Sequence, residues 1–398
     1  MNKQEIFGKI DQYSKEYKDE MIKTRRDLHK IPEISHDLPK TREYILNKLK
    51  NYDLEIREMV GDGGITATLK FPNPGKNIAY RADMDALPIE EENEVDYRSE
   101  HKGKMHACGH DVHVTVALSI LKVMYNFREE LSGSIKFIFQ PAEETDGGAL
   151  GMIKDGALEN PKVDFIFGSH VWPSIITGGI GLKQGPIMAG TDMIEINVQG
   201  KGGHIAMPHK SVNPLVVCSK IVNEIEGFKN YFIDSKENAV ISFGALNAGE
   251  TYNIIPDKGI LKGSVRTFNK ETKDIIKNKF QTVVDNIGEI YDAKCTLNYK
   301  ENYPPTINDD EVVEKVEEIL VDLKETNRIN KIKHPSMGAE DFSYFLQEVP
   351  GAFIFLGTKN EEKNITWGIH NPKFNVDEDI LEIAAKIYPK IMIEFLDK

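Results

Sequence analysis

Short, apolar, β-rich runs alternate with longer segments of helical pattern along this 398-residue chain. Runs as apolar as these are typical of strands that are buried on both faces of a parallel or mixed sheet. Helices must then cover both faces of the sheet, so the pattern predicts an α/β fold with a central mixed sheet flanked by helices. The expected strands are 77–82, 134–140, 163–168 and 352–356, and the two clearest expected helices are 111–127 and 379–396.

The middle of the chain has a different order of expected elements. It reads strand, helix, strand, strand, helix, strand, which is the order of a ferredoxin-like α+β fold. Crossings that contain glycine or proline, at 178–190 and 303–305, flank this region. We therefore expect a larger domain built from residues 1–188 and 304–398, with a smaller ferredoxin-like domain, 189–303, inserted into it.

Charge and hydropathy argue against two classes of partner. The chain carries 63 acidic and 50 basic residues, a net charge of −13, and an acidic chain without a basic patch is repelled by nucleic-acid phosphates. Its apolar runs are shorter than the roughly 18–20 residues of a membrane span, and its N-terminal residues are polar where a signal peptide is apolar. Three cysteines far apart in the sequence favour a reducing compartment. We expect a cytoplasmic protein that binds neither nucleic acid nor membranes.

Residues with metal-binding side chains stand at or just beyond the ends of the expected strands. In open α/β sheets, ligands bind beyond the carboxyl ends of the strands. The residues at these ends are Asp83, Asp85, Glu143, Glu144, His170 and His370. Cys108 and His110 stand at the start of the expected helix 111–127. Sequence-distant segments that each end in a donor group are what a metal site at the edge of a sheet requires.

Five of these side chains offer nitrogen, sulfur or oxygen donors that suit a divalent ion such as Zn²⁺ or Mn²⁺. They are Cys108, His110, Glu144, His170 and His370. A catalytic zinc ion takes fewer protein ligands, because it keeps a position for water, so five donors predict two ions that share a ligand. Glu143 would then remain to take a proton from water and pass it to a leaving amine. A single buried cysteine is more often a core residue, but five donors at strand ends and a helix start have no common structural explanation.

Ten motifs, spread over nearly the whole chain, carry a family resemblance. They are RRDLHKIPE (25–33), RADMDALPI (81–89), MHACGHDVH (105–113), FQPAEE (139–144), GSHVWP (168–173), GKGGHIAMPH (200–209), YNIIPD (252–257), GSVRTF (263–268), GAEDFSYF (338–345) and GIHNPKF (368–374). In this order they resemble the aminoacylase, hippurate hydrolase and indole-acetyl-amino-acid hydrolase family of dinuclear metallo-amidohydrolases. The resemblance implies a zinc-peptidase-like catalytic domain whose inserted ferredoxin-like domain acts as a lid and commonly dimerises.

The resemblance also implies roles in the catalytic domain. The implied metal ligands are Cys108, His110, Glu144, His170 and His370. Glu143 is implied to be the general base. Related peptidases have a His-x-Asp ligand pair where this chain has Asp83-Met84-Asp85, so we expect Asp85 to orient a ligand.

Three further residues gain roles from the resemblance, all in the inserted domain. His204 is implied to reach the active site of a neighbouring subunit and to stabilise the oxyanion there. Asn253 and Arg266 are implied to contact the carboxylate of the substrate. These roles predict a homodimer that forms through the lid domain.

The expected activity is hydrolysis of the amide bond of an N-acyl-L-amino acid, which releases a carboxylic acid and a free amino acid. Two divalent ions per subunit, Zn²⁺ or Mn²⁺, would be the cofactors. Deacetylation of N-acetyl-diaminopimelate and a dipeptidase or carboxypeptidase activity are the alternatives among enzymes. A binding protein on the same scaffold is the alternative outside them, but a binding protein has no need of the base Glu143.

Overall fold

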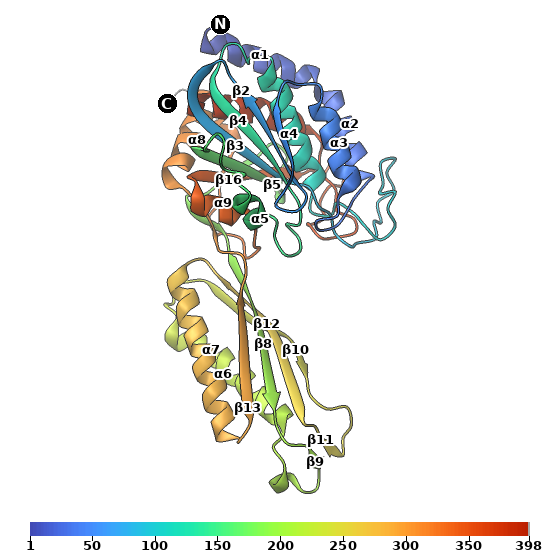
Figure 1. The fold of residues 1–398 in the computed structure, drawn as a ribbon, viewed down its shortest axis with the longest axis vertical. Helices are drawn as coiled ribbons and strands as arrows, with labels where there is room; N and C mark the ends of the chain where they lie inside the picture. The colour runs from blue at the N-terminus through green and yellow to red at the C-terminus, as the bar shows by residue number, and fades with distance from the viewer. Residues whose placement is uncertain (397–398) are drawn as a thin grey trace. The chain divides into compact units, whose positions relative to one another are not determined.

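The structure, a computed structural model, describes residues 1–396, except for the side chains of residues 229 and 230. The chain forms two compact units. Figure 1 shows the chain coloured by residue number from blue at the N-terminus to red at the C-terminus. Unit 1 consists of Met1–Ile187, Ile307–His334 and the described chain from Asp341 onward, and unit 2 consists of Met188–Thr306 and Pro335–Glu340. Within the described chain, no helix combines the length and the apolarity that a membrane span needs.

A mixed eight-stranded sheet forms the centre of unit 1, in the order β1-β2-β4-β3-β5-β16-β6-β15. Its strands are β1 (Glu55–Val60), β2 (Gly64–Lys70), β3 (Asn73–Asp83), β4 (Ser132–Gln140), β5 (Phe165–Ile176), β6 (Ile180–Leu182), β15 (Ile329–Lys331) and β16 (Gly351–Lys359). The four neighbours β4, β3, β5 and β16 are parallel, whereas β1, β2 and β4 pair antiparallel. The predicted apolar runs lie in the four parallel strands, and the predicted mixed sheet is confirmed.

Helices cover both faces of this sheet (Figure 1). They are α1 (Lys3–Glu16), α2 (Lys18–His29), α3 (Pro39–Leu49), α4 (His110–Tyr125), α5 (Ala149–Lys154), α8 (Asp310–Asp322), α9 (Phe342–Glu348) and α10 (Asp379–Leu396). The Tyr80 ring of β3 lies 5.0 Å from the Tyr388 ring of α10, whereas the guanidinium of Arg81 lies 5.9 Å from the Phe342 ring of α9. Because successive side chains of a strand point to opposite faces, α10 and α9 cover opposite faces of the sheet. Helix α4 packs beside α10 and is buried along almost its whole length.

Unit 2 has the predicted order of strands and helices. Its elements are β8 (Gly190–Gln199), α6 (Pro214–Phe232), β10 (Ala239–Asn247), β12 (Lys258–Thr267), α7 (Lys270–Ile290) and β13 (Lys294–Glu301). The strands pair antiparallel in the order β10-β12-β8-β13, which is the ferredoxin-like arrangement. Its core is one cluster of buried apolar side chains, which includes Ile196 of β8, Ile221 of α6 and Phe280 of α7.

Two small sheets complete the fold. Strands β7 (Gly185–Met188) and β14 (Thr306–Asn308) pair where the chain passes between the units. Strands β9 (Gly203–His204) and β11 (Ile254–Ile255) pair just beyond the end of the unit 2 sheet at which β8 ends and β12 begins. The segment that contains β9 and β11 therefore extends from one end of that sheet.

The units differ from the expected domains at Met188, at residues 304–306 and in one separate segment. Residues 335–340, which the sequence assigns to the larger domain, group with unit 2. The backbone of Ser336 accepts a hydrogen bond from the N–H of Ala189 at 2.9 Å, and the backbone of Glu340 accepts one from the hydroxyl of Thr306 at 3.4 Å. Such contacts join residues far apart in sequence, and the segment itself has no apolar periodicity that indicates its partner.

Candidate metal centre

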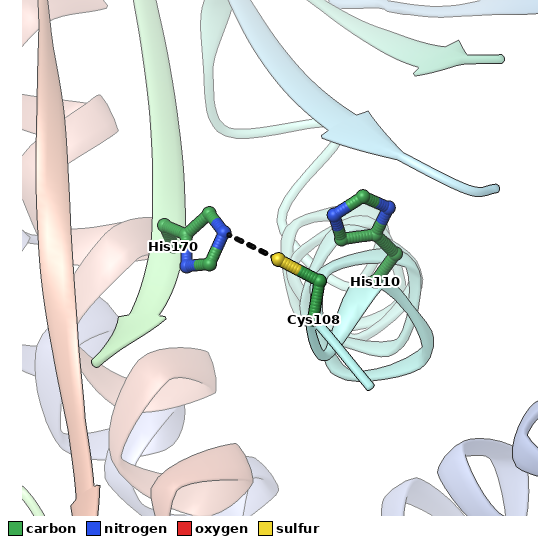
Figure 2. A group of neighbouring side chains, drawn as sticks. All are labelled: Cys108, His110 and His170. Carbon is green, nitrogen blue, oxygen red and sulfur yellow. Dashed lines mark hydrogen bonds between the residues drawn. The ribbon is translucent and has the colours of Figure 1, made fainter. Parts of the chain in front are cut away.

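Two groups of donor side chains share Cys108. In the first group, ligand atoms of Cys108, His110 and His170 lie within 4.8 Å of one another, and in the second the same holds for Cys108, Glu144 and His370. Figure 2 shows the first group, in which the His170 ring from β5 faces the Cys108 sulfur at 3.3 Å and His110 extends from the start of α4. The structure thus brings all five predicted ligands together around one sulfur atom. A residue common to two groups fits two neighbouring ions with a shared ligand.

The backbone around Cys108 is shaped by a left-handed turn. Gly109 lies between Cys108 and His110 with φ of 89°, and a Cβ atom on it would lie 2.4 Å from Val171. Only glycine fits there, because it has no Cβ atom. The chain can therefore make a tight turn into α4, with Cys108 and His110 on either side of the turn. His370 also has a left-handed φ, of 62°, and its N–H donates to the carbonyl of Ala107 at 2.8 Å. This hydrogen bond fixes the segment of His370 to that of Cys108.

The unused polar atoms of this cluster fit a metal ion. Among the described residues, neither ring nitrogen of His110 makes a hydrogen bond, and neither does Oε1 of Glu144, although all three atoms are buried. In His170, Nδ1–H donates to the carbonyl of Val171 at 2.7 Å, so Nε2 presents its lone pair toward the Cys108 sulfur. Buried polar atoms are normally satisfied. Nδ1 of His110 faces Asp85 at 3.5 Å, whereas Nε2 of His110 lies 3.8 Å from Oε1 of Glu144, so Nε2 and Oε1 face the same place. A divalent cation there would satisfy them together.

Electrostatics favour a cation at the same place. Burial by itself lowers the pKa of His110, but the carboxylates of Asp83 and Asp85 raise it to about 10. Burial raises the pKa of the Cys108 thiol far above its ordinary value, and the charges of Glu144 and Glu143 raise it further. The carboxylates around His110 and Cys108 therefore favour positive charge at this place. A divalent cation would take the place of the protons on these two side chains, since metal ligands must be deprotonated.

His113 supports the cluster without offering it a lone pair. Its Nε2 accepts a hydrogen bond from the N–H of Val171 at 2.9 Å, so the proton is on Nδ1, which donates to Asp83 at 2.5 Å. Burial lowers the pKa of this ring, which favours the neutral form that this pattern requires. His113 thus fixes the backbone beside His170 to the carboxylate of Asp83.

Asp85 holds the segment that carries Glu143 and Glu144. Its carboxylate accepts the N–H of Glu143 at 3.0 Å and the N–H of Glu144 at 3.2 Å, and it lies 3.5 Å from Nδ1 of His110. A carboxylate oxygen of Glu143 lies within 4.8 Å of donor atoms of His110 and Glu144. Glu143 is buried, with 6% of its surface exposed. A buried carboxylate is therefore held beside the ligand cluster.

The candidate residues of unit 2 lie at two different ends of its sheet. His204 in β9 and Asn253 just before β11 are exposed neighbours, joined by the hydrogen bond from the N–H of Ile205 to the carbonyl of Asn253. Arg266 is half-buried near the end of β12, where it pairs with Thr191 of β8. Strand β12 runs from Lys258 to Thr267, so its two ends are about 30 Å apart at about 3.3 Å per residue.

A buried network next to the cluster contains three residues, Arg81, Gln140 and Asp341, that are absent from the sequence-based candidates. The Arg81 guanidinium donates to Asp83 at 2.6 Å and to Asp341 at 2.7 Å, and its Nε donates to the side chain of Gln140 at 2.8 Å. All four side chains are at most 1% exposed. Asp341 lies in the motif GAEDFSYF, which is the one signal in the sequence that could have marked it.

Comparisons with known proteins agree with this geometry. The model of peptidase family M20/M25/M40 matches residues 79–394. Thermostable carboxypeptidase 2 of Saccharolobus solfataricus is 37% identical, with 99% of this chain and 100% of that protein covered. Hippurate hydrolase of Campylobacter jejuni is 34% identical, with 95% and 97% covered. The solved structure of the Bacillus subtilis YXEP protein, described as a dinuclear metal binding peptidase from the M20 family, aligns with a TM-score of 0.83 at 32% identity, with 96% and 99% covered.

Proposed function

The chain belongs to peptidase family M20/M25/M40 and hydrolyses amide bonds, and we propose that its substrates are N-acyl-L-amino acids. The products would be a carboxylic acid and a free amino acid. The observation that carries the proposal is the buried carboxylate of Glu143 within 4.8 Å of the donor atoms of His110 and Glu144. A base held next to a set of metal ligands serves the hydrolysis of an amide, whereas binding alone does not require it.

The proposed cofactors are two divalent ions, Zn²⁺ or Mn²⁺, held by the two donor groups that share Cys108. When bound, such ions would polarise the acyl carbonyl and make the attacking water more acidic. Glu143 takes the proton from that water and returns it to the leaving nitrogen. Asp85 keeps Glu143 in place through the hydrogen bonds that it accepts from two backbone N–H groups.

We also propose a cytoplasmic location, which the cysteine content supports.

The separation of His204 and Arg266 supports the proposal of a homodimer. A substrate of the size of an amino acid cannot contact both ends of a strand that is about 30 Å long. We therefore propose that His204 and Asn253 act in the active site of the partner subunit, and that Arg266 does not act in the same site as the His204 of its own chain. The N–H of Ala206 donates to Nδ1 of His204, so the ring proton is on Nε2 and can be donated to an oxyanion.

The edge strand β10 supports dimerisation through unit 2. It pairs with β12 on one side and forms the edge of the four-stranded sheet. Val240 and Leu246 on this strand are 39% and 41% exposed. A long edge strand with apolar side chains is a surface on which a second chain can pair.

A substrate panel combined with metal analysis tests the proposed function. Purified protein of known metal content is assayed with N-acetyl amino acids, benzoylglycine, N-acetyl-diaminopimelate and dipeptides. We expect the highest kcat/KM with a simple N-acyl amino acid. The carboxypeptidase among the similar proteins makes a peptidase the second candidate, and a clear preference for dipeptides or longer peptides would replace the proposal with that activity.

Replacing Cys108 by alanine should weaken metal binding by more than about 100-fold, because losing only a residue that supports a ligand already costs about 10–100-fold. Both ions should be lost, since the two donor groups share this sulfur. Metal content after dialysis, measured by inductively coupled plasma mass spectrometry, checks the result. Cys218→Ala is the matched control, because Cys218 is also a buried free cysteine but lies in α6 of unit 2. Full metal content and activity in Cys108→Ala would make Cys108 a core residue.

A further inference from the structure

The segment that carries Glu143 and Glu144 has a strained backbone. It connects β4 to α5, and Ala142, directly before Glu143, is fully buried with φ of 60°. A residue with a Cβ atom is disfavoured in this left-handed region and persists there only where its surroundings hold it. The conformation that presents Glu143 therefore depends on contacts outside the segment.

Asp341 makes such contacts at both ends of the segment, whereas Asp85 contacts its middle, at Glu143 and Glu144. At the start, the side-chain amide of Gln140 donates to both carboxylate oxygens of Asp341, at 2.8 and 2.7 Å. At the end, the backbone N–H of Ala149 donates to Oδ2 of Asp341 at 3.0 Å. One carboxylate thus joins the last residue of β4 to the first residue of α5, and it fixes the distance that the strained segment must span.

The charge of Asp341 is balanced by a buried cation. Arg81 donates to Asp341 at 2.7 Å and to Gln140 at 2.8 Å, so the three side chains form a closed triangle of hydrogen bonds. Buried charge-assisted hydrogen bonds of this kind are directional and rigid. A carboxylate oxygen of Asp341 also lies within 4.8 Å of one of Glu143, so the triangle stands directly behind the proposed base.

We propose that Asp341 is a positioning residue, which holds the segment 141–148 in the strained conformation that places the Glu143 carboxylate for proton transfer. The inference rests on the proposed function, in which Glu143 is the base. Asp341 touches neither substrate nor metal in this role and acts through Glu143. Loss of its contacts lets the segment relax, so that Glu143 is present but displaced, and a small displacement of a catalytic group is costly.

The first experiment is Asp341→Asn, which keeps the shape of the side chain and removes its charge. We expect kcat to fall by about 10–100-fold, with KM within about threefold of wild type and with unchanged metal content. Gln140→Leu is the second variant, because it removes the link to the start of the segment without leaving a buried charge unpaired. It should lower kcat in the same direction, and it keeps the test valid if Asp341→Asn does not fold.

Asp11→Asn is the matched control. It also removes a carboxylate from a buried cation, since Asp11 binds Lys390 at 2.5 Å, but these residues join α1 to α10 and do not contact the segment 141–148. Thermal unfolding of all variants measures the loss of stability. We expect Asp11→Asn to lose stability and keep its kcat, whereas Asp341→Asn loses kcat. That difference would separate a positioning role from general weakening of the fold.

A double-mutant cycle with Glu143→Gln tests whether Asp341 acts through Glu143. If it does, Asp341→Asn causes little further loss once Glu143 has lost its basicity, because residues that act as a unit are not additive. An equal loss in both backgrounds, or wild-type kcat in folded Asp341→Asn and Gln140→Leu, overturns the inference while Glu143 remains the base. High activity in Glu143→Gln alone instead overturns the proposed function.

Discussion

Replacing Glu143 by glutamine is expected to lower kcat by about 10²–10⁴-fold, which is the usual contribution of a general base. Glutamine keeps the shape of the side chain and loses its basicity. Metal content should stay near wild type, because the donor groups around Cys108 remain complete without Glu143. Steady-state kinetics with an N-acyl amino acid and metal analysis of the same preparation check both expectations.

The control for this variant is Glu129→Gln, which makes the same change on an exposed side chain. It should leave kcat, KM and metal content unchanged. If Glu143→Gln retained more than a few per cent of the wild-type kcat, Glu143 would not be the base. If it lost its metal instead, Glu143 would be a ligand.

Replacing His204 by alanine should lower kcat by about 10²–10³-fold, because an oxyanion donor typically contributes about 2.7–4 kcal/mol to transition-state binding. Stability should change little, since His204 is exposed and surface substitutions usually change the free energy of unfolding by less than about 0.5 kcal/mol. Metal content should be unchanged, because unit 2 contains none of the proposed ligands. His209→Ala, also exposed and five residues away, is the matched control and should have wild-type kinetics.

Mixing His204→Ala with Glu143→Gln tests the assignment to the partner subunit. In each mixed dimer, one site combines an intact Glu143 with the partner's intact histidine, so a 1:1 mixture of exchanging subunits should recover up to about a quarter of the wild-type activity. Native mass spectrometry first verifies that subunits exchange. Exchange without recovery of activity would show that His204 does not act across the interface.

The central sheet could be predicted because its parallel strands are short, largely apolar runs. Few structures other than a buried strand accommodate such runs. The strand boundaries were less accurate. The sequence placed His170 beyond a strand that ends at residue 168, whereas β5 continues to Ile176. Ser169, His170, Pro173 and Ser174 interrupt the apolar run there. Strands β6 and β15 are only three residues long, which is too short for any periodicity to indicate them.

The donor residues could be proposed from the sequence because metal chemistry restricts the residue types. Cys108 and His110 stand out for what their side chains can bind, whatever their surroundings. The residue type of Asp341 gives no such indication, because most aspartates are exposed. Its role comes from contacts with Gln140 and Ala149, about 200 residues earlier in the sequence. Contacts of that kind belong to the folded chain and have no local pattern.

The grouping of residues 335–340 with unit 2 has a consequence for protein engineering. Unit 2 takes its chain from two separate stretches, Met188–Thr306 and Pro335–Glu340. A chimera that exchanges only the long stretch with a similar enzyme would keep the native short stretch, and it could lose side-chain contacts between the two stretches, such as that from the Thr306 hydroxyl to the Glu340 backbone. Recombination between such enzymes therefore needs four breakpoints, and a cassette cut at two of them should yield a unit 2 that folds poorly.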